Sequence, residues 1–177
     1  EEADAFEDIG NDKVEFVEDR QFVSVPKRGA AQALRTAVRN RKNILISGGT
    51  STGKTTFLNS LLAEIPREER LVLIEDTAEL HLRHENAVGL IAARGELSEA
   101  QISAEDLLIA ALRMRPDRII LGELRGVEAF TFLRVVNTGH PGSMTTVHAD
   151  TPQRAIEQLS LLVLQAGAKL SRDDGRH

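Results

Sequence analysis

The chain of 177 residues contains no cysteine. This absence excludes disulfide bonds, cysteine-ligated zinc sites and thiol catalysis together, and it is consistent with a reducing compartment. No stretch reaches the roughly 18 consecutive apolar residues of a membrane span, and the first residues are acidic instead of basic and then apolar. We therefore expect a cytoplasmic protein, or a fragment of one.

A surplus of positive charge is also missing, because 27 acidic residues outnumber 22 basic ones and the net charge is −5. Without a broad basic surface, nucleic acid and anionic lipid are not the expected partners. Hydrophobic residues make up 41% of the chain, which is enough for a buried core at single-domain length. The composition thus predicts one globular domain.

The beginning of the chain differs from the rest. Residues 1–13 hold six acids against one lysine, and residues 1–29 are predicted to be an acidic leader or linker. Within this segment, Val14–Val25 is compatible with an edge strand or with the tail of a preceding domain. Residues 30–177 are predicted to form the folded domain.

From residue 30 onward, short β-rich runs alternate with helical segments, which is typical of crossover units and a mostly parallel sheet. The predicted strands are Asn43–Ser47, Leu71–Glu75, Arg118–Glu123 and Gly142–Val147. Helices are predicted at Ala30–Lys42, Lys54–Ala63, Ser103–Pro116 and Val127–Asn137, with a last one from Thr151. Leu80–Ala93 lacks helical periodicity and is predicted to be an extended or hairpin excursion. The fold class is therefore α/β, with a sheet flanked by helices.

A phosphate-binding loop lies between the first predicted strand of this series and the helix that follows it. The run GGTSTGKTT at residues 48–56 matches GxxxxGK[ST] in the context that the motif requires. Its glycines allow successive N–H groups to point at phosphate oxygens, and the helix start adds its positive dipole end. The predicted nucleotide-binding residues are Gly48, Gly49, Thr50, Ser51, Thr52, Gly53, Lys54, Thr55 and Thr56. A glycine-rich turn without a ligand is the alternative.

Three of these residues have specific expected roles. Lys54 is expected to reach the β- and γ-phosphates, Thr55 to place its hydroxyl on Mg²⁺, and Thr56 to contact the α-phosphate. The motif therefore predicts ATP and Mg²⁺ as the cofactors of a RecA-like P-loop core.

Acidic residues follow two of the predicted strands, where ligands bind in open α/β sheets. Leu71–Ile74 ends in Glu75 and Asp76, and Ile119–Leu121 is followed by Gly122 and Glu123. A carboxylate beside Mg²⁺ can hold a metal-bound water or deprotonate the attacking one. Glu75 and Asp76 are equally compatible with turn or capping acids, and Glu123 with a solvated strand end.

Histidine and arginine provide weaker candidates. His148 after the fourth strand, and His140 before it, are candidates for contact with the γ-phosphate, although a lone histidine more often makes a local hydrogen bond. His81 and His84 have no matching third ligand nearby and are predicted to be surface residues. Four arginines surround the third strand and are compatible with a site, an interface or solvated ion pairs: Arg113, Arg115, Arg118 and Arg125.

Taken in chain order, these pieces resemble the traffic ATPases of the type II and type IV secretion superfamily. Four boxes carry the resemblance: GGTSTGKTT at 48–56, LVLIEDTAEL at 71–80, RPDRIILGELRG at 115–126 and NTGHPGSMTTVHAD at 137–150. The third box looks like the family variant in which glycine precedes the glutamate. The residue pattern of the last two boxes is similar to that of the hexameric VirB-type ATPase of type IV secretion and conjugation systems.

The resemblance implies a role for each matching residue. Mg-ATP would bind at the first box, Glu75 and Asp76 would act at the metal and water, Glu123 would be the catalytic glutamate, and His140 and His148 would form the His box. The implied assembly is a homohexameric ring that is peripheral at the cytoplasmic face of the inner membrane. There it would contact inner-membrane secretion components and drive export, conjugation or pilus assembly.

Two departures from the family pattern are expected to matter. The chain has no segment long enough for the family's separate N-terminal domain, and it stops soon after the helix beginning at Pro152. Both suggest truncation at each end, which puts autonomous ring formation in doubt.

Other functions remain as alternatives. Tight-adherence and retraction pilus motors stay open, whereas type II secretion and pilus assembly ATPases typically carry a four-cysteine zinc module that this chain lacks. A GTPase switch is disfavoured because neither NKxD nor DxxG is present. A non-catalytic nucleotide-binding scaffold is the last alternative.

Overall fold

The computed structural model describes residues 13–18, 21–81, 83–93 and 101–174. Strands β1 (Lys13–Glu18) and β2 (Gln21–Pro26) form an antiparallel pair. The helix predicted from Ala30 begins three residues earlier, as α1 (Lys27–Arg39). β1 and β2 form a sheet of their own and add no edge strand to the main sheet, whereas residues 1–12 lie outside the described part. That residues 1–29 act as a leader or linker stays a prediction.

The second sheet has five parallel strands in the order β3-β7-β6-β4-β5. Its strands are β3 (Ile44–Gly48), β4 (Leu71–Glu75), β5 (Ala87–Ile91), β6 (Arg118–Leu124) and β7 (Met144–His148). The remaining helices are α2 (Lys54–Leu62), α3 (Ala104–Ala111) with the short η1 (Leu112–Met114), α4 (Glu128–Asn137) and α5 (Pro152–Asp174). The predicted α/β class, with a mostly parallel sheet flanked by helices, is confirmed.

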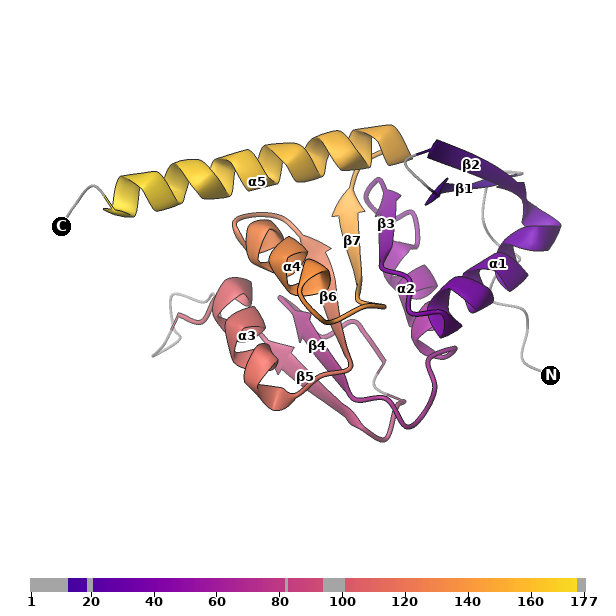
Figure 1. Ribbon diagram of the computed structural model, residues 1–177, viewed down its shortest axis with the longest axis horizontal. Coiled ribbons are helices and arrows are strands. Elements are labelled where there is room, and N and C mark those ends of the chain that lie inside the picture. Colours follow the sequence, from indigo (N-terminus) through magenta and orange to yellow (C-terminus); the bar gives the residue numbers. More distant parts are fainter. Residues whose placement is uncertain (1–12, 19–20, 82, 94–100, 175–177) are drawn as a thin grey trace.

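One predicted element was partly wrong. Within Leu80–Ala93 the extended part is β5, which pairs in parallel with β4, so the excursion is not a hairpin. The connection after β4 returns to the opposite edge of the sheet before β5 begins, and both strands then run the same way (Figure 1).

Helices cover both faces of the sheet, so the central strands are buried on both sides (Figure 1). On one face, α1 and α2 pack against Leu71 and Leu73 of β4. On the other face, α3, α4 and α5 pack against Val72 and Ile74 of the same strand. Burial on both faces explains why β4 is an uninterrupted apolar run up to Glu75, as is typical of parallel sheets. Among the described residues, no helix has the length and apolar character needed to cross a bilayer.

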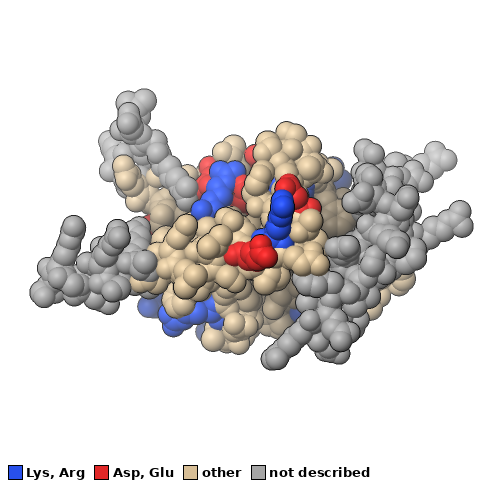
Figure 2. Space-filling view, turned by 90° about the horizontal axis from the view of Figure 1, so that it is seen from above, with Lys and Arg blue, Asp and Glu red and all other residues tan. Residues whose placement is uncertain are grey.

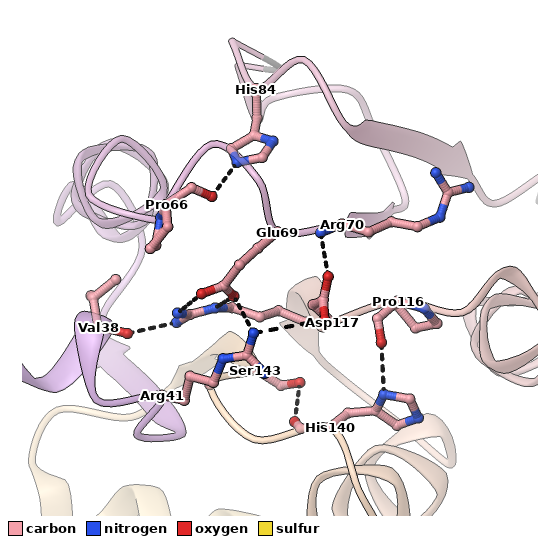
Figure 3. A network of polar contacts seen from close by, with 12 residues as sticks. Val38, Arg41, Pro66, Glu69, Arg70, His84, Pro116, Asp117, His140 and Ser143 are labelled. Atoms are coloured by element: carbon pink, nitrogen blue, oxygen red, sulfur yellow. Dashed lines mark hydrogen bonds and ion pairs between the residues drawn. The ribbon is translucent and has the colours of Figure 1, made fainter.

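The edge of the sheet where the strands begin is held together by a buried ion pair (Figure 3). Arg118 has no exposed surface and binds Glu69 through two contacts, from Nε at 2.5 Å and from Nη2 at 2.9 Å. Its Nη1 donates to the carbonyl oxygen of Val38 at 2.8 Å, and Arg41 lies 3.5 Å from Glu69. Gly142 is required beside this pair, because a Cβ there would lie 2.8 Å from Arg118 Nη1 and the residue has φ of 83°.

The ion pair makes the fold sensitive to acid. The hydrogen bond from Arg118 lowers the pKa of Glu69 below its ordinary value of 4.5, and this effect exceeds the opposing effect of burial. A carboxylate with a lowered pKa in the folded state stabilises the fold above the pKa of the unfolded state. This contribution is lost as the pH falls below 4.5 and through the lowered folded-state pKa.

Glu69→Ala should lower the free energy of unfolding by about 3–5 kcal/mol, because it leaves the fully buried Arg118 charge without its carboxylate. Urea titration at neutral pH measures this loss. Glu64→Ala is the matched control, since Glu64 pairs with the partly exposed Arg35 at 2.8 Å and its loss should cost no more than about 1 kcal/mol. Equal losses in the two variants would contradict the assignment.

Candidate nucleotide-binding site

The P-loop runs from the end of β3 into α2 and is shaped by its glycines. A Cβ on Gly48 would lie 2.5 Å from Thr52 Oγ1, so the tight turn excludes any side chain there. Gly53 precedes α2 with φ of 84°, a conformation that favours glycine. Thr52 Oγ1 donates to the Gly49 carbonyl at 2.9 Å and closes the loop. Thr50 and Ser51, at the tip of the loop, are exposed. Thr56, which follows Thr55 in the first turn of α2, is exposed as well.

Lys54 lies across the mouth of this loop. Its Nζ donates to the carbonyl oxygens of Gly48 at 3.0 Å and Gly49 at 2.7 Å. The ammonium group is therefore beside the backbone that a phosphate-binding loop presents to its ligand. The structure thus places the Lys54 ammonium group against the loop backbone, and its contact with phosphates stays a prediction.

An acid that the sequence analysis missed lies beside Thr55. The Thr55 hydroxyl donates to Glu79 Oε2 at 3.1 Å, which leaves the oxygen lone pairs of Thr55 free to face a cation. Hard cations such as Mg²⁺ prefer oxygen ligands and often use only one or two protein groups together with substrate phosphates. The pair formed by Thr55 and Glu79 fits that chemistry. Among the described residues, no group of three or more histidine and acidic side chains forms a cation site from protein atoms alone.

Glu75 accepts hydrogen bonds from the turn that follows β4. Its side chain is 6% exposed, and Oε1 accepts the backbone N–H groups of Glu79 at 2.9 Å and Leu80 at 2.8 Å. Asn59 of α2 holds the same turn through Glu79 O at 3.3 Å and the N–H of His81 at 2.8 Å. Glu75 therefore fixes the turn that carries Glu79, and its expected action at the metal stays a prediction.

Glu123 lies at a bulge in β6. The ladder pairs Leu121 with Thr145 but Leu124 with Val147, so β6 uses one residue more than β7 across this interval. The hydroxyl of Thr146 satisfies the carbonyl of Gly122 at 2.8 Å. A bulge of this kind re-aims the side chains of the strand that contains it.

Gly122, which precedes Glu123, packs beside Glu75. A Cβ on Gly122 would make ordinary contacts, at 3.4 Å from Glu75 Cγ and 3.6 Å from the carbonyl oxygen of Ile74, so packing alone does not require glycine there. Asp76, at the end of the neighbouring strand, lies 3.6 Å from Arg125, which also pairs with Glu123.

The two candidate histidines lie at opposite edges of the sheet. His148 ends β7, is exposed, and is the register partner of Gly48, the first residue of the P-loop. His140 precedes β7, at the edge where the strands begin, and its Nδ1 donates to the Pro116 carbonyl at 3.0 Å (Figure 3). The structure therefore does not bring His140 to the P-loop of its own chain, because the whole of β7 separates the two histidines. His84 is likewise occupied, with Nε2 at 2.8 Å from the Pro66 carbonyl.

Comparison with known proteins assigns the chain to a family. The model of the family described as Type II/IV secretion system protein matches residues 11–172. The chain belongs to this family. It is 50% identical over 145 residues to the type IV secretion system protein VirB11 of Bartonella henselae, covering 81% of this chain and 41% of that protein. It is 43% identical over 146 residues to the conjugal transfer protein TrbB of Rhizobium radiobacter, covering 81% and 43%.

Solved structures of similar proteins share the fold. The VirB11 ATPase of the Brucella suis type IV secretion system, in complex with sulphate, superposes with a TM-score of 0.70 at 42% identity, covering 78% of this chain and 40% of that one. The pilus retraction motor PilT with bound ADP superposes at 0.59 with 28% identity, covering 82% and 46%. The chain thus spans about two fifths of the length of the VirB11 relatives that it matches.

Glu79→Ala should raise the Mg²⁺ concentration needed for nucleotide binding by about 10–100-fold, as is usual when a partner of a metal-binding side chain is removed. Titration of Mg²⁺ against binding of a fluorescent nucleotide measures the shift. Glu85→Ala is the control, because Glu85 is an exposed acid on the same connection between β4 and β5. An unchanged Mg²⁺ requirement in Glu79→Ala would return the metal-side role to Glu75 or Asp76.

Proposed function

We propose that this chain is the catalytic core of a Mg²⁺-dependent ATPase that powers a type IV secretion system, as its VirB11 relatives suggest. The observation that carries the proposal is the meeting, at one edge of the sheet, of the P-loop, the Thr55 and Glu79 pair, and Glu123. A protein that only bound nucleotide as a scaffold would need the loop but would not need an acid at the end of β6.

Nucleotide binding is assigned to the loop and the first turn of α2. The N–H groups of residues 48–55 and the positive end of the helix dipole would hold the phosphates, and Lys54 would add a point charge. Thr55 would hold the cation, with Glu79 accepting the proton of its hydroxyl. When bound, Mg-ATP supplies the phosphoryl group and the cation that shields its negative charge.

Hydrolysis is assigned to Glu123. Its carboxylate would accept a proton from the attacking water, which is the step that phosphoryl transfer to water requires of a protein base. His148 is exposed opposite Gly48, where its imidazole can donate a hydrogen bond to the terminal phosphate. Asp76 would act on Glu123 indirectly, because both carboxylates pair with Arg125.

The larger assembly is also a proposal. A homohexameric ring, peripheral at the cytoplasmic face of the inner membrane and in contact with inner-membrane secretion components, agrees with the VirB11 and TrbB relatives. A retraction motor remains the second candidate because PilT shares the fold at 28% identity. The 50% identity to VirB11 favours the secretion ATPase.

Lys54→Ala should weaken Mg-ATP binding at least tenfold, equivalent to about 1.4 kcal/mol, because it removes the charge beside the phosphates. Isothermal titration calorimetry gives the two affinities. Lys42→Ala serves as the control, since Lys42 is an exposed lysine before β3, at the other edge of the sheet. If Lys54→Ala binds as tightly as the wild type, the loop does not hold the phosphates.

Glu123→Gln should keep ATP binding and lose most of the turnover, because the amide preserves the shape of the side chain but cannot accept the proton of water. Steady-state phosphate release, measured beside equilibrium binding, separates the two effects. Near-normal hydrolysis in this variant would move the role of base to Asp76 or Glu79.

A further inference from the structure

Arg125 is the basic side chain that joins the ends of β4 and β6. Its Nε donates to Glu123 Oε2 in a short hydrogen bond, and its Nη1 lies 3.6 Å from Asp76 Oδ2. The guanidinium group thus contacts the acid that we assign as the base and an acid from the neighbouring strand. The planar fork of arginine suits such a bridge, because its donors point in fixed directions.

The backbone of Arg125 is held by hydrogen bonds as well. Its N–H and that of Gly126 both donate to Glu128 Oε1 at 2.7 Å. Glu128 is 3% exposed, at the first turn of α4. A buried carboxylate therefore fixes the backbone of Arg125, and two strand-end carboxylates fix its guanidinium.

Stability does not explain this arrangement. The side chain of Arg125 is 61% exposed, and ion pairs at exposed sites contribute only about 0–1 kcal/mol to folding. The hydrogen bond to Glu123 raises the pKa of Arg125, aided by the charges of Glu123, Asp76 and Glu79 and opposed by burial. The guanidinium is thus a permanent cation among acids that would otherwise repel one another.

We propose that Arg125 is a positioning residue for hydrolysis, which fixes the orientation of the Glu123 carboxylate by bridging it to Asp76. This inference rests on the proposed ATPase function and adds to it a residue that does not itself hold nucleotide. Arg125 acts after binding, because its contacts are with the base and not with the P-loop or with Thr55. A misoriented base slows the reaction without weakening the affinity for the substrate.

The test compares Arg125→Ala and Arg125→Lys with the wild-type protein in steady-state ATP hydrolysis and in equilibrium binding of nucleotide. Arg125→Ala should lower kcat by about 10²-fold, the usual cost of misplacing a reacting group, with KM and the nucleotide Kd unchanged within about twofold. Arg125→Lys should recover part of the loss, because it restores the charge but not the fork. Arg39→Ala is the matched control, since Arg39 is 67% exposed and lies 3.9 Å from Glu64, at the other edge of the sheet.

Chemical rescue distinguishes positioning from a merely structural role. Guanidinium chloride at millimolar concentrations, far below those that unfold proteins, should restore turnover to Arg125→Ala because the missing group can rebind between the two carboxylates. It should not accelerate the wild type or Arg39→Ala. Thermal unfolding of every variant shows whether the fold is retained.

Three results would overturn the inference while leaving the ATPase proposal intact. They are turnover of Arg125→Ala equal to that of Arg39→Ala, a faster Arg125→Ala, and loss of turnover through a raised Kd. A faster variant would mean that the arginine holds Glu123 away from the reaction. Absence of ATP hydrolysis in the wild type would instead contradict the proposed function itself.

Discussion

Because the five strands of the main sheet run in one direction, each of them begins at one edge of that sheet and ends at the other. The two edges carry different kinds of residues. The ends of β3, β4, β6 and β7 carry the P-loop, the turn with Glu79, Glu123 and His148. The beginnings carry the ion pair between Arg118 and Glu69, which is buried and contributes to stability.

Charge follows the same division. At the edge with the ion pair, Arg118 and Glu69 are paired and buried, and hydrogen bonds link the loops before the strands (Figure 3). Seen from the side of α5, a few basic and acidic side chains are interspersed on the described part of the surface (Figure 2). Exposed charges of this kind contribute little to folding.

The sequence predicts most of this architecture because the physical signals are local. β4 is apolar at every position before Glu75, as burial on both faces requires, and the P-loop lies between a strand and a helix. The strand-end rule then brings Glu75, Asp76, Glu123 and His148 to one edge. What local signals cannot give is the direction of a side chain within a turn.

The missed and corrected residues illustrate that limit. Glu75 and Glu79 are four residues apart in one acidic turn, and only the backbone hydrogen bonds to Glu75 show which of them is occupied. His140 and His148 belong to one motif, yet β7 separates them, and a motif read as a string does not show that distance. The sequence does not distinguish the role of Arg125 from those of three other arginines around β6. Its two carboxylate partners in the structure do.

Because of the bulge in β6, the position of Glu123 depends more on the number of residues between Leu121 and Leu124 than on the chemistry of their side chains. Deleting Gly122 would restore a regular ladder with β7, in which Leu121 still pairs with Thr145 and Leu124 with Val147. Glu123 would then lie directly opposite Thr146, without the bulge that re-aims its side chain. Homologues should therefore avoid insertions and deletions between Leu121 and Leu124, and their alignment here should follow strand register.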